Sequence, residues 1–208
     1  HSLLGFVISL LLVFRTNTAY DRWWEGRKQW GALVNVSRNF ALKVISFIPK
    51  EDQELADRLL DADACYADVL RGHLRDVSKA ELLARIPNGL DKALDSNHIP
   101  NVVASNMQKD ALAAYKKHEI SQAAYLSMLE DINKFTDICG ACERIKKTPI
   151  PYTYNIFIKK FIFVYIVSMP IAFVSDFHYW TILVTGFTFY TLASLEVIAE
   201  TIEDPFGM

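Results

Sequence analysis

Two cysteines, Cys139 and Cys142, are the residues of this sequence best suited to redox or metal chemistry. Thiols at this spacing exchange disulfides in oxidoreductases or supply half of a zinc site. A zinc site would need further cysteines or histidines nearby, and the five histidines of the chain are scattered. We therefore interpret the pair chiefly as small residues that let helices pack closely. Thiol oxidoreductase chemistry is the alternative.

Three acidic residues form a second candidate group near the end of the sequence. Glu196, Glu200 and Glu203 are spaced by four and three residues, so they share one face of a helix. Such a face could attract cations or bind a hard metal ion. A solvated helix end is the alternative interpretation.

An apolar stripe near the start of the sequence carries the most specific hypothesis. Phe6, Leu10 and Phe14 are spaced by four, so they line one side of a helix. If several copies of this helix surround an axis, the stripe becomes three apolar rings, and such a constriction can gate ions by dewetting. Taken alone, the spacing is more typical of core packing.

The composition excludes several classes of function. The sequence contains no glycine-rich phosphate loop, no GxSxG and no HExxH, so we predict no catalytic residue, no metal and no cofactor. A formal net charge of −2 gives no reason to expect nucleic-acid binding. Three cysteines are too few for an extracellular disulfide framework.

The elements that must position these residues include two long apolar segments. Phe161–Ser175 has no charged residue, and Phe177–Leu195 has none beyond one histidine. A membrane-spanning helix needs about 20 apolar residues, which the second segment provides and the first provides once Ile156–Lys160 are added, with their lysines reaching toward the headgroups. The two segments therefore predict a transmembrane hairpin with a turn near Ser175–His178. Ser2–Phe14 is also apolar, but it is too short to span by itself. The chain turns polar at Arg15–Asn17.

The middle of the chain predicts amphipathic helices and no strand. Apolar positions recur at helical spacing up to Pro49, Ser78 opens a capping box, and Ser121 can cap a later helix. The expected segments are helices over Asp52–Asp76, from Ser78 to Pro87, from Pro100 to about His118 and from Ser121 to about Lys146, with a loop over Asn88–Asn97.

Three blocks of the sequence resemble the bestrophin family, specifically its bacterial members. They are LLGFVISLLLVFRTNTAYDRWWEGRKQWGALVN at 3–35, CGACERIKKTPIPYTY at 139–154 and IAETIEDPFG at 198–207. The helices between the blocks fit the same order. The resemblance therefore covers essentially the whole chain.

The resemblance implies a homopentameric ion channel with a large helical cytosolic region and one continuous central pore. The family's second membrane helix lines a narrow apolar neck, and alignment on Arg22–Trp24 places its three rings at Phe6, Leu10 and Phe14. A second, cytosolic constriction falls near Ile120–Ala124, most directly at Ala123. Animal members pass chloride, whereas bacterial relatives can favour monovalent cations such as sodium, so the sign of the conducted ion stays open.

Two departures from the family qualify these expectations. The family's first membrane helix has no counterpart in the chain, so we expect a fragment of a longer subunit. The acidic run with which calcium-activated animal members clasp calcium is also absent after Phe206. Calcium gating is therefore not expected.

We expect an all-α integral membrane protein that assembles around a central pore. Residues 1–19 are predicted to be a pore-lining helix, 20–153 a cytosolic helical region, 154–196 a transmembrane hairpin and 197–208 a cytosolic tail. Lysines before the hairpin predict that residues 20–153 and the C-terminus are cytoplasmic in a multi-pass protein of the cell (inner or plasma) membrane. The expected partners are permeant inorganic ions, the lipid bilayer and four further copies of the chain. Besides the oxidoreductase, a non-conducting membrane scaffold is the alternative.

Overall fold

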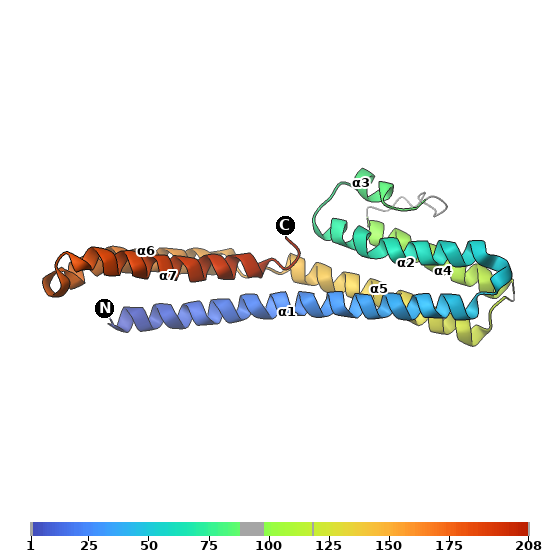
Figure 1. Ribbon diagram of the computed structural model, residues 1–208, viewed down its shortest axis with the longest axis horizontal. Helices are drawn as coiled ribbons and strands as arrows, with labels where there is room; N and C mark the ends of the chain where they lie inside the picture. Colours follow the sequence, from blue (N-terminus) through green and yellow to red (C-terminus); the bar gives the residue numbers. More distant parts are fainter. Residues whose placement is uncertain (1, 88–97, 118, 208) are drawn as a thin grey trace. The chain divides into compact units, whose positions relative to one another are not determined.

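The computed structural model describes residues 2–87, 98–117 and 119–207, and these residues form helices without a strand (Figure 1). The predicted all-α fold class is therefore confirmed. The helices are α1 (Ser2–Phe47), α2 (Gln53–Leu74), α3 (Lys79–Ala84), α4 (Ile99–Lys116), α5 (Gln122–Lys147), α6 (Tyr152–Phe177) and α7 (Trp180–Glu203), with a 3-10 turn at Lys50–Asp52. They belong to two compact units. Unit 1 combines the start of α1, up to Glu25, with Thr148–Pro205, and unit 2 combines Gly26–Lys147 with Phe206.

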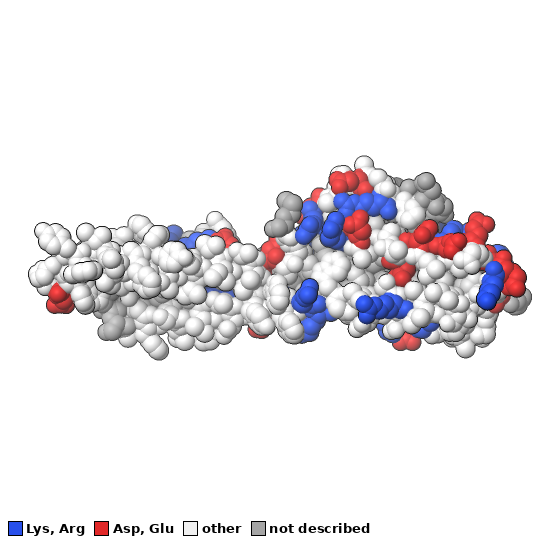
Figure 2. Space-filling model, in the orientation of Figure 1, with Lys and Arg blue, Asp and Glu red and all other residues white. Residues whose placement is uncertain are grey.

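Unit 1 contains apolar surface on a scale typical of membrane proteins. Among the described residues, α1, α6 and α7 are long and apolar enough to cross a membrane. Few side chains in the most apolar part of each helix are buried within the chain. The face of unit 1 seen in Figure 2 carries only a few Lys, Arg, Asp or Glu side chains. The hairpin turn lies at His178–Tyr179, slightly later than predicted. We expect lipid or other protein to cover this surface, because exposing so large an apolar area to water is unfavourable.

Helix α1 is continuous across the boundary that the sequence analysis placed after residue 19. It runs for 46 residues, and unit 1 gives way to unit 2 at Glu25–Gly26 rather than at a helix end. The polar residues after Phe14 do not break it, because the hydroxyl of Thr16 donates to the Leu12 carbonyl 2.8 Å away, one turn back. No proline lies anywhere in α1, and no glycine lies between Phe14 and Glu25.

Unit 2 has an ordinary hydrophobic core formed by α2, α4, α5 and the later part of α1. Its centre is aromatic: the rings of Tyr66 and Phe135 lie 4.8 Å apart, and Phe40 meets Phe135 edge-on at 6.0 Å. The Tyr66 hydroxyl donates a 3.0 Å hydrogen bond to the Phe135 carbonyl, so its burial leaves no polar group unpaired. Charged side chains gather over this part of the chain (Figure 2).

Helix boundaries in unit 2 follow the local signals read from the sequence. Asp52 caps α2, Ser78 caps α3 and Ser121 accepts from the Ala124 amide at the start of α5. Pro100 lies in the first turn of α4, where its missing amide hydrogen is harmless. The predicted loop at Asn88–Asn97 lies outside the described residues, as does His118.

A buried carboxylate between α1 and α2 makes the stability of unit 2 depend on pH. Burial raises the pKa of Asp63 to about 6, although the hydroxyl of Ser37 donates to its Oδ2 over 3.1 Å, which lowers the pKa. The folded state therefore holds the proton more tightly than the unfolded state. The contribution of Asp63 to stability is therefore fully present below about pH 4 and is lost as the pH rises through 6.

We expect Asp63→Asn to stabilise the protein at pH 8 by up to about 3 kcal/mol, since it removes the charge whose burial is unfavourable. At pH 4 the same variant should differ little from the parent chain. Thermal unfolding of both proteins at the two pH values measures this difference. Asp61→Asn, an exposed position on the same helix, is the matched control and should show no such pH dependence.

Candidate functional site

The predicted stripe of α1 lies on the outer face of unit 1. Phe6, Leu10 and Phe14 are 66%, 43% and 56% exposed, whereas Ile8 and Leu12 are buried against α6. Two residues along a helix turn the side chain by about 200°, so the stripe lies opposite the packed face. Large apolar side chains at this exposure are available to a further copy of the chain or to a pore.

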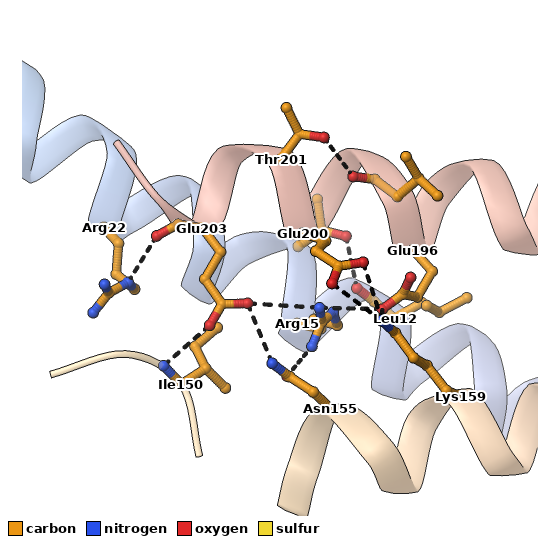
Figure 3. A network of polar contacts seen from close by, with 12 residues as sticks. Leu12, Arg15, Arg22, Ile150, Asn155, Lys159, Glu196, Glu200, Thr201 and Glu203 are labelled. Carbon is orange, nitrogen blue, oxygen red and sulfur yellow. Dashed lines mark hydrogen bonds and ion pairs between the residues drawn. The ribbon is translucent and has the colours of Figure 1, made fainter. Parts of the chain in front are cut away.

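A buried arginine of α1 contacts residues of α6 and α7 (Figure 3). Arg15 is 1% exposed, and its Nη2 lies 3.2 Å from Glu196 Oε1 and 3.6 Å from Glu203 Oε2. Its Nη1 donates to the side chain of Asn155, whose Nδ2 lies 3.4 Å from Glu203 Oε2. A guanidinium in apolar surroundings requires such partners. Arg15 follows Ile8 by seven residues and so lies on the same face of the helix, which means that its contacts hold the packed face of α1 inward and leave the stripe on the other side.

The three acidic residues proposed from sequence converge on two cations. Glu196 contacts both Arg15 and Lys159, while Glu200 lies 3.1 Å from Lys159 Nζ. Glu203 Oε1 accepts from the backbone amide of Ile150 over 3.1 Å (Figure 3). Glu196 and Glu203 are thus held in a structural network, and Glu200 is the exposed member. Cation attraction by this face stays a prediction, with its charge largely matched by Arg15 and Lys159.

The two residues assigned to a cytosolic aperture differ in accessibility. Ile120 is buried in the core of unit 2, whereas Ala123, in the first turn of α5, is exposed. Ala123 therefore has a side chain that could face a pore without repacking of the core. The aperture assignment itself stays a prediction.

The two thiols of the CxxC motif are poorly suited to nucleophilic chemistry. Cys139 and Cys142 are each 1% exposed in the core of unit 2, and neither is in a disulfide. Burial raises the pKa of Cys139 to about 12 and that of Cys142 to about 11. The thiolate is the reactive form of cysteine, so both residues act as core side chains at neutral pH.

Arg15 is the important residue that sequence reasoning missed. A single arginine directly after a 13-residue apolar run, with Glu196 at the end of another apolar segment, was the available signal. Charges at such positions are rarely left without a partner in a membrane protein. The pair could have been anticipated from that rule, although the contribution of Asn155 could not.

Comparisons with known proteins show what this chain is similar to. The family model described as Bacterial/Fungal Bestrophin protein matches residues 1–208. A voltage-dependent anion channel-forming protein of Synechocystis sp. is 36% identical over 208 residues, which cover 98% of this chain and 68% of the relative. YneE of Escherichia coli K12, with the same descriptive name, is 32% identical over 99% of this chain and 68% of its own. These relatives are named as channels, not as enzymes.

A solved structure has a fold very similar to that of this chain. The crystal structure of a bacterial bestrophin homolog from Klebsiella pneumoniae has a TM-score of 0.92 and 27% sequence identity to this chain. The match covers 100% of this chain and 77% of that one. Both compact units therefore have their counterparts in a single known protein.

Proposed function

The chain belongs to the bacterial and fungal bestrophin family, and we propose from this membership that it conducts anions passively across the cell membrane. In this proposal five copies surround an axis, and Phe6, Leu10 and Phe14 of each copy form the three apolar rings of a neck. The observation that carries it is the exposure of this stripe on α1, opposite the face that Arg15 anchors. Apolar rings can gate ion flow by dewetting.

We propose anions rather than sodium as the conducted ions. The two relatives compared are both named as anion channel-forming proteins. The main sequence feature in favour of cations was the acidic face of α7, and there Glu196 and Glu203 contact Arg15. An apolar neck does not itself select the sign of the charge. Selection would then depend on polar groups on either side of the rings.

The proposed orientation follows from the lysines that precede the hairpin or lie near its start. Lys159 and Lys160 lie in the first turns of α6, and Lys146 and Lys147 end α5. Lysines beside a span favour the cytoplasmic side. We infer that residues 20–153 and the tail after residue 196 are cytoplasmic, and that α6 and α7 hold the neck helices in place.

Reversal potentials in planar bilayers test this function. With the purified protein in a sodium chloride gradient, we expect a reversal potential close to the chloride equilibrium potential. A potential near that of sodium would overturn the proposed selectivity while leaving a channel. The absence of any current, from protein shown to be inserted and oligomeric, would favour the non-conducting scaffold instead.

Replacing the two thiols distinguishes the oxidoreductase alternative from the channel. Changing both Cys139 and Cys142 to serine should leave the conductance in place, since neither side chain is accessible. Loss of a dithiol exchange activity in that variant would support the alternative. The raised pKa of both thiols argues against it.

A further inference from the structure

Two histidines and a glutamate meet in unit 2, and none of them belongs to the Arg15 network of unit 1. His73 lies in the last turn of α2, His98 caps α4, and Glu143 lies in the last turns of α5. The His73 Nε2 is 2.6 Å from Glu143 Oε1, and the His98 Nε2 is 2.8 Å from the same oxygen. Three helices thus bring one ligand atom each to a single point.

We propose that His73, His98 and Glu143 form a binding site for a divalent transition metal ion of the Zn²⁺ class. One ligand atom from each residue lies within 4.8 Å of the other two. Two imidazole nitrogens and one carboxylate oxygen are a common ligand set for zinc. Oxygen-preferring ions such as Mg²⁺ and Ca²⁺ would not favour the two nitrogens.

The geometry requires only small movements for an ion to enter. Zinc–ligand bonds of about 2.0–2.1 Å in a tetrahedral site separate neighbouring ligand atoms by about 3.3 Å. The two nitrogen–oxygen distances must therefore open slightly from 2.6 and 2.8 Å, and the two nitrogens must lie at a similar distance from each other. The two imidazole rings already lie side by side, with centroids 4.6 Å apart and planes inclined by 45°.

The surroundings leave room for a fourth ligand. The side chains of His73, His98 and Glu143 are 23%, 30% and 20% exposed, so an ion can reach them from solvent. A cavity of about 280 Å³ lies beside them, lined in part by His73, Glu143 and Lys147. A water molecule in this cavity would complete the tetrahedron, as it does in zinc sites with three protein ligands.

Two nearby lysines do not prevent binding. Lys146 lies 2.6 Å from Asp76, which matches its charge. Lys147 is 73% exposed and lies 3.9 Å from Glu143 Oε2, the oxygen that the histidines do not contact, and an exposed ion pair of this kind contributes little. The hydrogen bond from the Asn101 amide to His98 Nδ1 is long, at 3.3 Å. For Nε2 to bind the metal, the ring proton of His98 must move to Nδ1. The Asn101 amide then loses this hydrogen bond, and the loss costs little because the bond is long.

A bound ion would connect the last turn of α2, the start of α4 and the end of α5. These helices share the core of unit 2, and the ion would hold their ends together at the surface. Since the ion binds the folded state only, it should also raise the stability of this unit. This proposal does not depend on the conduction of ions by the chain.

The test uses Zn²⁺ alone with the tag-free, chelator-treated protein in detergent. We expect isothermal titration to give one Zn²⁺ per chain with micromolar or tighter affinity. The melting temperature should rise by about 5–10 °C when free Zn²⁺ is a hundred times the dissociation constant. His73→Gln and His98→Gln should each weaken binding at least tenfold, whereas His178→Gln, an exposed histidine of the α6–α7 turn, should bind like the parent chain.

Cobalt spectroscopy keeps the proposal testable if a variant fails to fold. Co²⁺ in the parent chain should give the visible bands of a four-coordinate site without the near-ultraviolet charge-transfer band of a cobalt–thiolate bond. No binding of Zn²⁺ by the folded parent chain would overturn the site. A thiolate band, or full affinity in both histidine variants, would also overturn it by placing the ion elsewhere.

Discussion

Changing Phe6, Leu10 and Phe14 together to alanine is expected to raise the anion conductance of the reconstituted protein by about tenfold. Each substitution widens a ring and removes apolar surface, so water and ions enter the neck more readily. A barrier lower by about 1.4 kcal/mol suffices for a tenfold change in rate. Because the three side chains are exposed within the chain, their removal leaves the packing of α1 on α6 intact. Single-channel recording or chloride efflux from liposomes measures the effect.

A control of matched chemistry distinguishes the neck from general loosening of the membrane part. Phe163, Leu183 and Phe187 are also two phenylalanines and one leucine, 68%, 63% and 69% exposed on α6 and α7. Their joint replacement by alanine should leave the conductance unchanged, since the proposal places them outside the neck. An equal increase in both triple variants would contradict the ring assignment. So would an unchanged conductance in a ring variant that still forms pentamers.

Local signals were sufficient for the helix boundaries and for the apolar segments. Ser78 and Ser121 cap the helices that they were expected to cap, because a cap depends only on residues three positions away. The α6–α7 hairpin follows from composition over some 20 residues, which no polar segment interrupts. The stripe at Phe6, Leu10 and Phe14 follows from spacing. Its exposure follows only from the structure.

Features that depend on distant partners could not be predicted. The sequence shows only that the chain turns polar after Phe14, whereas in the structure Thr16 bonds back to its own helix and Arg15 pairs with residues far along the chain. Its contact with Asn155 spans 140 residues. The hydrogen bond between His73 and Glu143 joins residues 70 positions apart. No periodicity or motif connects positions so far apart, because tertiary packing alone brings them together.

Changing Arg15 to methionine should destabilise the protein by about 3–5 kcal/mol. The substitution preserves much of the side-chain volume but leaves the carboxylates of Glu196 and Glu203, which Arg15 contacts at 3.2 and 3.6 Å, without their buried cation. For a chain of this size the loss corresponds to a melting temperature lower by about 10 °C or more. Thermal unfolding in detergent, followed by the loss of helical circular dichroism, gives the measurement.

Lys159→Met is the matched control, because Lys159 also contacts Glu196 but is 48% exposed. An ion pair with a solvated partner contributes little, so we expect a change of less than about 1 kcal/mol. If Lys159→Met destabilised the protein as strongly as Arg15→Met, burial would not be the reason for the importance of Arg15.

Compensation provides the stricter test of this argument. When Glu196 and Glu203 are changed to glutamine in the Arg15→Met background, the uncompensated buried charges disappear, and much of the lost stability should return. Glu203→Gln keeps an oxygen that can accept from the Ile150 amide, so that hydrogen bond is preserved. Failure of the triple variant to recover would mean that Arg15 acts through packing instead of charge. Recovery of stability without recovery of normal conductance would show that the network also holds the rotation of α1, on which the outward position of Phe14 depends.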